Sequence, residues 1–147
     1  MAVAGRVGDH SQTHPHLPLL TDAAVLQQVT GARTAITATT GRDPRPLFRF
    51  PYGDSTAHTI ALVNQTGFIA IGWTVDSLGW MGPSGGVTVN SVVSRVFASR
   101  TPGEIVLMHV GSNPTDHTTL DAAALPRVIA ALAAAGYSFV TLDALLR

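Results

Sequence analysis

The short apolar run Ile105-Val-Leu-Met108 is followed, after a polar loop, by a longer amphipathic run. The longer run is Leu120-Asp-Ala-Ala-Ala-Leu-Pro-Arg-Val-Ile-Ala-Ala-Leu-Ala-Ala-Ala135. The first run is too short for a helix and predicts a buried strand. The second run predicts a helix with Gly136 as its C-cap. The apolar face expected on that helix consists of Leu120, Ala124, Val128, Ile129 and Leu132.

The same alternation recurs along the rest of the chain. Turn and capping residues delimit expected helices at 22–40, 55–65 and 89–99, expected strands at 47–50, 68–75 and 139–142, and a last helical turn from Asp143. Strand–helix alternation predicts parallel strands joined by right-handed crossovers. We therefore expect a single α/β domain over residues 1–147, with about five or six mainly parallel strands.

The composition argues against several classes of protein. Apolar residues make up 46% of the chain and charged residues 12%, so the chain can bury a core. Nine basic residues, all arginine, balance nine acidic ones, which argues against nucleic acid or an anionic membrane as a partner. No cysteine occurs, and no apolar run is long enough for membrane insertion. Residues 1–6 lack the layout of a signal peptide, so we expect any export signal to lie outside this sequence.

Polar side chains gather where the expected strands end, which is where ligands bind in parallel α/β folds. Two histidines spaced four residues apart put both imidazoles on one side of a turn, as a metal ion requires. The residues that follow the expected strands are His10 and His14, then Arg49 and Tyr52, then Asp76, then His109.

Each of these groups has a plainer interpretation when it is taken alone. Two loop histidines are more often solvent-facing side chains, and His16 and His58 have no partners at a metal-binding spacing. A lone histidine after a strand is more often a hydrogen-bonded core residue. Tryptophans such as Trp73 and Trp80 more often pack in a core than hold a sugar. The combined order of the motifs is therefore what favours a functional site.

That order resembles the polysaccharide deacetylase family, the NodB-homology domain of carbohydrate esterase family 4. The matching motifs are His10-Ser-Gln-Thr-His14, Arg49-Phe-Pro-Tyr-Gly53, Trp73-Thr-Val-Asp-Ser-Leu-Gly-Trp80 and Leu107-Met-His109. The resemblance extends over residues 8–146. It implies a distorted (β/α) barrel and hydrolysis of N- or O-linked acetyl groups on a polysaccharide such as chitin or chito-oligosaccharide, peptidoglycan or acetylxylan.

The resemblance also implies roles for individual residues. His10 and His14 are expected to bind Zn²⁺, or another divalent ion such as Co²⁺, which polarises the acetyl carbonyl. The backbone N–H of Tyr52 is expected to stabilise the oxyanion, and Arg49 to brace the catalytic carboxylate. His109 is the expected general acid. The expected substrate-binding residues are Pro51, Trp80 and Leu107.

Two departures from the family pattern concern the catalytic carboxylates. The family opens with a strand ending in T-F-D-D, and only nine residues precede His10. We therefore expect a truncated barrel that lacks the first strand–helix unit. Self-association, or a rearranged N-terminus, is expected to cover the exposed strand edge. Gly79 stands where the family usually has an aspartate that would pair with the Arg49 position, which leaves Asp76 as the local candidate.

Asp9 is the first candidate for a replacement base because it adjoins His10, with Asp54 and Asp116 as alternatives. Asp9 and Asp54 are each equally interpretable as solvated turn residues. Three functions stay open: a deacetylase, a glycan-binding domain without activity, and a shortened member recruited to another metal-dependent hydrolysis. The expected partner is an acetylated polysaccharide or oligosaccharide, and the expected location is secreted or at the cell envelope.

Overall fold

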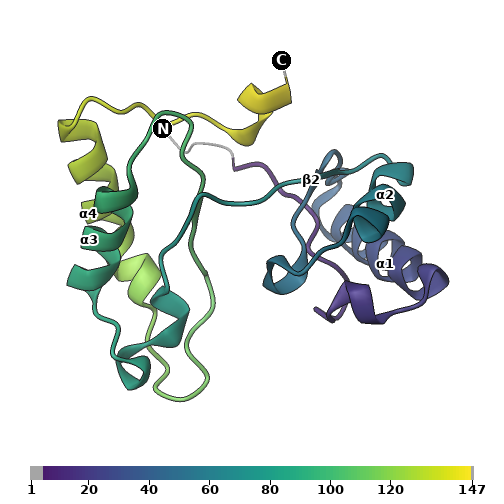
Figure 1. Ribbon diagram of the computed structural model, residues 1–147, viewed down its shortest axis with the longest axis horizontal. Coiled ribbons are helices and arrows are strands. Elements are labelled where there is room, and N and C mark those ends of the chain that lie inside the picture. Colours follow the sequence, from purple (N-terminus) through teal and green to yellow (C-terminus); the bar gives the residue numbers. More distant parts are fainter. Residues whose placement is uncertain (1–4, 147) are drawn as a thin grey trace. The chain divides into compact units, whose positions relative to one another are not determined.

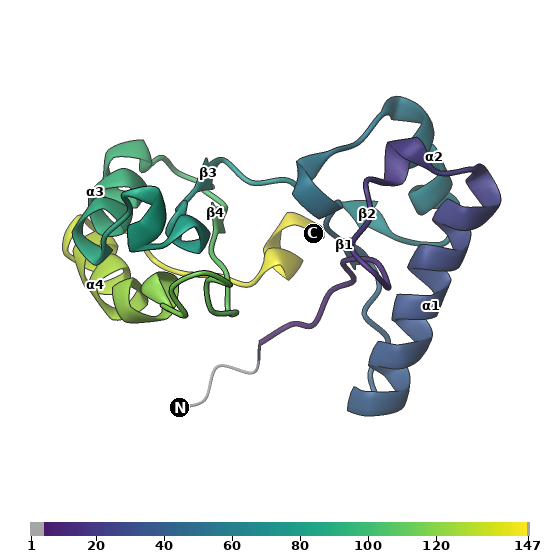
Figure 2. The same cartoon turned by 90° about the horizontal axis from the view of Figure 1, so that it is seen from below.

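The computed structural model describes residues 5–146 of the chain (Figures 1 and 2). The described residues divide into two compact units, the first comprising residues 5–72 and 141–146 and the second residues 73–140. In each unit a pair of parallel strands accompanies a pair of helices. In the part of the chain that is described, no helix is both long and apolar enough to cross a membrane.

The helices of the first unit are α1 (Asp22–Thr40) and α2 (Ala57–Gln65), which pack against each other. The side-chain oxygen of Thr21 caps α1 by accepting a hydrogen bond from the Ala24 N–H. Gly41 ends the helix in the left-handed conformation that glycine adopts without strain. The helix predicted at 22–40 is therefore confirmed.

The strands of the first unit are β1 (Leu47–Phe48) and β2 (Ile69–Ala70), which pair in parallel. Asp9 forms an isolated parallel bridge with Phe48, so the segment that leads into His10 runs beside β1. Strands and helices together bury a core that consists of Leu17, Val25, Val29, Phe48, Phe50, Leu62, Val63 and Phe68.

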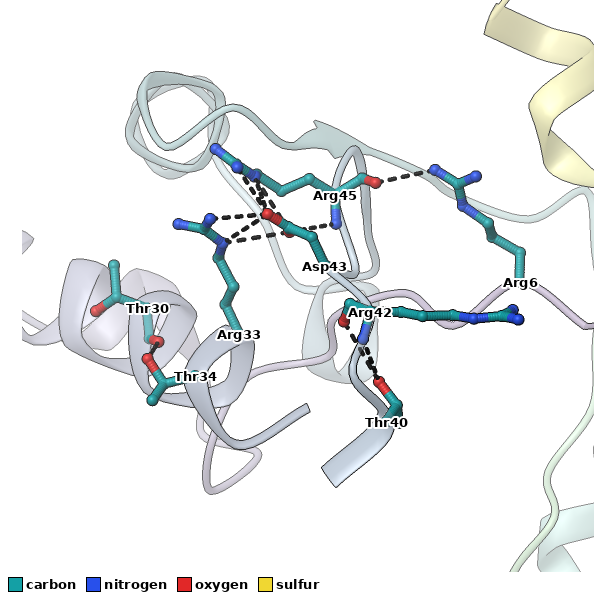
Figure 3. Close-up of polar contacts among 8 residues, drawn as sticks. All are labelled: Arg6, Thr30, Arg33, Thr34, Thr40, Arg42, Asp43 and Arg45. Atoms are coloured by element: carbon teal, nitrogen blue, oxygen red, sulfur yellow. Dashed lines mark hydrogen bonds and ion pairs between the residues drawn. The ribbon is translucent and has the colours of Figure 1, made fainter. Parts of the chain in front are cut away.

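An arginine–carboxylate cluster closes the connection between α1 and β1 (Figure 3). The Asp43 carboxylate accepts hydrogen bonds from the guanidinium groups of Arg33, with a shortest distance of 2.7 Å, and of Arg45, with a shortest distance of 2.6 Å. The bonds from Arg33 and then those from Arg45 hold the pKa of Asp43 well below its ordinary value of 3.8. The ionised carboxylate thus ties the end of α1 to the segment that enters β1.

The second unit pairs β3 (Val75–Asp76) with β4 (Val106–Leu107) in parallel. Its helices, α3 (Val89–Ser99) and α4 (Leu120–Ala134), lie side by side in Figures 1 and 2. Between them lies a core of Val92, Val96, Ala124, Val128 and Leu132. The short 3₁₀ helices among the described residues are η1 (Leu17–Leu19), η2 (Pro51–Gly53), η3 (Gly79–Met81), η4 (Pro83–Gly85) and η5 (Leu142–Leu146).

The strand predicted at 68–75 is wrong as a single element. The Ile71 N–H donates to the Phe48 carbonyl in the first unit, whereas the Thr74 N–H donates to the Ile105 carbonyl in the second. The hydrogen-bonding partner therefore changes within this apolar run, and the run contributes one strand to each unit. Hydrophobicity alone carries no information about such a change of partner.

The sequence also predicted more strands than the described residues contain. The described residues contain four strands in two parallel pairs, not five or six, and residues 139–142 form no strand. The helices at 89–99 and 120–134 are confirmed, but Ile129 is 43% exposed on α4 and not in the core. Asp121, at 4% exposure, is buried on that helix instead. The expectation of one domain over residues 1–147 stays a prediction.

Candidate functional site

The backbone beside β1 positions the first candidate residues. The Asp9 N–H donates to the Leu47 carbonyl, and the Arg49 N–H donates to the Asp9 carbonyl, which fixes the segment before His10 against β1. Gly8 allows this close approach, because a β-carbon there would lie 3.0 Å from the Leu47 carbonyl oxygen. The chain then turns at Ser11, whose φ of 69° is in the left-handed region.

His10 and His14 lie together in this turn. The Nε2 atoms of the two rings are 3.2 Å apart, and the ring centroids are 4.8 Å apart. Nδ1 of His10 lies 2.7 Å from the Arg49 carbonyl oxygen. Because a carbonyl oxygen can only accept, this contact puts the proton on Nδ1 and leaves a lone pair on Nε2. The predicted pair of imidazoles is thus brought together with both Nε2 atoms converging.

An aromatic stack extends from this pair. Tyr52 makes an edge contact with His14 at 4.5 Å between centroids and stacks on His16 at 4.1 Å. Tyr52 has a φ of 59° and is 60% exposed, and left-handed backbone at a residue other than glycine is concentrated at functional sites. Nδ1 of His16 lies 2.9 Å from Oδ2 of Asp54. Sequence reasoning set His16 aside because it considered metal spacing and not stacking.

Asp9 lies beneath the turn and is only 2% exposed. One carboxylate oxygen, Oδ1, accepts a hydrogen bond from the Ser11 N–H, whereas Oδ2 is buried without a hydrogen-bond partner among the described residues. Burial raises the pKa of this carboxyl from 3.8 to about 6, and backbone hydrogen bonds from Ser11 and His10 oppose that rise. A buried carboxyl with a raised pKa is a candidate for a functional group.

His109 belongs to the second unit and directly follows β4 and Met108. Its backbone N–H donates to Oδ2 of Asp121 at 2.7 Å, and its ring Nδ1 lies 3.7 Å from the same oxygen. The second distance is too long for a hydrogen bond. The sequence did not single out Asp121, because its contact with His109 follows from no motif or spacing.

The other candidates of the second unit surround β3. Oδ1 of Asp76 accepts from the Leu78 N–H, and Nε1 of Trp80 lies 3.4 Å from Oδ2 of Asp76. Trp80 is 49% exposed and makes an edge contact with His109 at 6.4 Å between centroids. Leu107 is buried in β4. The structure therefore groups Trp80, Asp76 and His109 within one unit.

Two expectations remain: the pairing of Asp76 with Arg49, and the use of Asp116 as an alternative base. Asp76 and Arg49 belong to different units, so their pairing stays a prediction. Asp116, an alternative base, accepts hydrogen bonds from the Thr118 hydroxyl at 2.6 Å and from the Ser84 N–H at 3.1 Å. These bonds hold its pKa well below the ordinary value. Asp116 therefore stabilises this loop through its hydrogen bonds.

A comparison with known families and proteins assigns the chain. A family model described as polysaccharide deacetylase matches residues 1–71. The chain is 27% identical over 139 residues to a peptidoglycan-N-acetylglucosamine deacetylase of Bacillus cereus, an alignment covering 95% of this chain and 48% of the relative. It is 34% identical over 145 residues to a chitooligosaccharide deacetylase of a Bradyrhizobium species, covering 93% of this chain and 64% of the relative.

Solved structures agree with these relatives. The crystal structure of a carbohydrate esterase family 4 pseudoenzyme from Bacillus anthracis matches with a TM-score of 0.81 and 30% identity, covering 96% of this chain and 46% of that one. The chain spans less than two thirds of the length of each of these three proteins. Motifs, fold and relatives agree, and the chain therefore belongs to the polysaccharide deacetylase family.

Proposed function

We propose that this protein removes acetyl groups from an acetylated glycan, using a divalent metal ion held by His10 and His14. The observation that carries the proposal is the 3.2 Å separation of the two Nε2 atoms, with the proton of His10 fixed on Nδ1 by the Arg49 carbonyl. Deacetylase relatives acting on peptidoglycan and chitooligosaccharides supply the reaction type.

The donor set fits Zn²⁺, or another ion such as Co²⁺. Two Zn–N bonds of ~2.0–2.1 Å at a tetrahedral angle put the nitrogen atoms ~3.3 Å apart, close to the separation between these rings. Among residues 5–146, no group of three His, Cys, Asp or Glu side chains could hold a metal ion. We therefore expect binding through two imidazoles, weaker than at a complete site.

The chain's own residues account for the remaining chemistry in this proposal. A bound ion supplies Lewis-acid polarisation of the acetyl carbonyl. The Tyr52 N–H donates to the carbonyl oxygen as negative charge develops on it. His109 donates a proton to the leaving nitrogen or oxygen as its bond to the acetyl carbon breaks. Leu107 contacts the acetyl methyl, and Arg49 braces the catalytic carboxylate. Pro51, which is buried in the first unit, and Trp80, which is exposed in the second, are each proposed as substrate-binding residues.

Asp9 is proposed as the base that takes a proton from the attacking water. Its pKa of about 6 is close to neutral pH, where a base is most effective, and its buried Oδ2 has no hydrogen-bond partner among the described residues. Asp54 is the alternative, since its side chain is 41% exposed and accessible to water. Its Oδ2 is already 2.9 Å from Nδ1 of His16, which is why Asp9 is preferred.

A glycan-binding role without catalysis is the second candidate. It is favoured by the likeness to the Bacillus anthracis pseudoenzyme and by the exposed rings of Tyr52 and Trp80, which suit stacking on a sugar. In either case the two parallel strand pairs are proposed to be parts of a distorted (β/α) barrel. A secreted or envelope location is proposed because peptidoglycan, the substrate named for one relative, lies there.

Acetate release tests the proposal directly. The chain is stripped of metal and assayed on chito-oligosaccharide, peptidoglycan and acetylxylan, with and without Zn²⁺. We expect zinc-stimulated release that is abolished in the double variant His10→Ala/His14→Ala. His58→Ala is the matched control, because His58 is an exposed histidine of the same unit that bonds Asp22. We expect it to retain activity.

The same assay separates the alternatives. Asn at the true base should lower turnover by ~10²- to 10⁴-fold, so Asp9→Asn and Asp54→Asn identify which carboxylate acts. Absence of acetate from every substrate, combined with measurable oligosaccharide binding, would reject the hydrolase in favour of the glycan-binding domain. Absence of both release and binding would reject the two proposals together.

A further inference from the structure

Asp121 is the second residue of α4, yet its carboxylate is directed inward. The side chain is 3% exposed, and Oδ2 accepts a hydrogen bond from the backbone N–H of His109. Acidic residues are favoured in the first turn of a helix because of the helix dipole. That preference explains an aspartate at this position on a surface, but it does not explain why the carboxylate is buried against the residue that follows β4.

Among the described residues, two buried polar atoms of His109 and Asp121 lack a hydrogen-bond partner. Within the part of the chain that the structure describes, neither Nδ1 of His109 nor Oδ1 of Asp121 has a hydrogen-bond partner. The His109 side chain is 37% exposed overall, so the ring buries its Nδ1 edge and exposes another. Unpaired buried polar atoms are costly. The 3.7 Å between Nδ1 and Oδ2 is short enough to close by a small rotation of the ring.

Gly79 explains how this carboxylate finds room. A β-carbon at residue 79 would lie 2.8 Å from Oδ2 of Asp121 and closer still to Cγ and Oδ1. Gly79 is not among the glycines with positive φ, so its backbone conformation does not require glycine. The absence of a side chain at residue 79 thus provides space and not flexibility. The Asp121 carboxylate fills the volume that a side chain at position 79 would occupy.

We propose that Asp121 is the positioning residue for His109, with its carboxylate reaching from α4 into the volume that a side chain at position 79 would occupy. A small rotation of the ring closes the 3.7 Å gap so that Nδ1–H donates to Asp121, and the opposite nitrogen, Nε2, is then directed to the leaving group. In the reaction His109 gives its Nε2 proton to the leaving atom, while Nδ1–H stays bonded to Asp121. This assignment rests on the proposed deacetylase function.

Asp121→Asn is the most informative single change. The amide oxygen can still accept from the His109 backbone N–H, so the brace on the end of β4 is kept, but the charge that orients the ring is lost. We expect acetate release to fall about tenfold to hundredfold, the size of effect typical when a group that orients an active residue is removed. Arg127→Ala, at an exposed position of the same helix, is the control and should match the parent chain.

Moving the carboxylate back to position 79 is the second test. Gly79→Asp alone puts two carboxylates in one volume and should lower both melting temperature and activity. Gly79→Asp combined with Asp121→Ala should recover acetate release to within about tenfold of the parent. Recovery in the double variant is not expected if Asp121 serves only to brace the backbone.

Nitrogen-15 NMR of the His109 ring gives a readout that does not depend on activity. We expect the Nδ1 resonance to move in Asp121→Asn and to return toward the parent position in the double variant. Unchanged ring resonances in a folded Asp121→Asn protein would overturn the assignment. If the parent chain releases no acetate, the proposed function fails, and the ring resonances still decide whether Asp121 orients His109.

Discussion

The first unit and the second unit each hold a histidine expected to act in the reaction, and they hold it differently. In the first unit, Nδ1 of His10 lies 2.7 Å from the Arg49 carbonyl oxygen. In the second, Nδ1 of His109 lies 3.7 Å from a carboxylate oxygen of Asp121. A neutral carbonyl fixes the tautomer without adding charge, as suits a metal ligand. A carboxylate orients a ring and stabilises its cationic form, as suits an acid.

The partner of the second ring nitrogen therefore agrees with the role proposed for each histidine. The family resemblance implied a ligand and an acid, but no spacing in the sequence showed these ring partners, because they are remote in the chain. Arg49 is 39 residues from His10, and Asp121 is 12 residues from His109. The two assignments lead to different expectations for metal affinity, although loss of either function should lower turnover.

Removing the acid should produce the largest effect, because it should lower turnover without changing zinc affinity. We expect His109→Ala to lower acetate release by ~10²- to 10⁴-fold, because the leaving group is no longer protonated. Zinc affinity should stay at the parental value, since His109 is not a ligand in this account. Steady-state assays beside zinc titrations test both halves. A simultaneous loss of zinc affinity would show that the two histidines share one task.

The next prediction tests which face of α4 packs against the core of the second unit. Leu132 is 4% exposed and Ile129 is 43% exposed. Leu132→Ala should therefore lower the free energy of unfolding by ~2–5 kcal/mol through cavity formation. Ile129→Ala on the same helix should cost well under half of that, and urea denaturation measures both. Equal losses would mean that α4 presents a different face, which would also displace Asp121 from His109.

A smaller effect is expected from the Asp43 cluster of the first unit. Asp43→Asn removes the carboxylate charge and one of the two acceptor oxygens that bind Arg33 in α1 and Arg45 before β1 (Figure 3). The pKa of Asp43 is lower in the folded protein than its ordinary value of 3.8, so its contribution to stability is present above that value. This contribution is lost as the pH falls toward the depressed pKa.

Melting temperatures measured from pH 7 to pH 2 check this expectation. The parent should melt above Asp43→Asn at pH 7, and the two curves should converge in acid. Arg42→Gln is the control, because the side chain of Arg42 extends away from Asp43 in Figure 3. A gap of constant size across the pH range would mean that the carboxylate charge contributes nothing.

The sequence predicted the helices well because their signals are local. Thr21 and Gly41 cap the two ends of α1, and capping depends only on residues close to each helix end. Strands were harder, since the run at 68–75 is uniformly apolar and only the hydrogen bonds reveal that it pairs with two different partners. The same limit applies to sheet size, because short parallel strands depend on distant segments.

The site was predictable in part. His10 and His14 were found because four residues of spacing in a turn bring two rings together, and the structure shows that approach. His16 and Asp121 were missed because their importance comes from contacts with Tyr52 and His109 that no spacing encodes. The catalytic and metal-binding roles themselves stay predictions.

Zinc binding measured by calorimetry tests whether His10 and His14 form the metal site. The metal-free chain should bind about one zinc ion, and affinity should weaken as pH falls through ~6.5, because only a neutral imidazole is a ligand. In His10→Ala/His14→Ala the binding heat should disappear, while His58→Ala should match the parent. Unchanged zinc affinity in the double variant would contradict the account, because the converging Nε2 atoms would then not be the metal site.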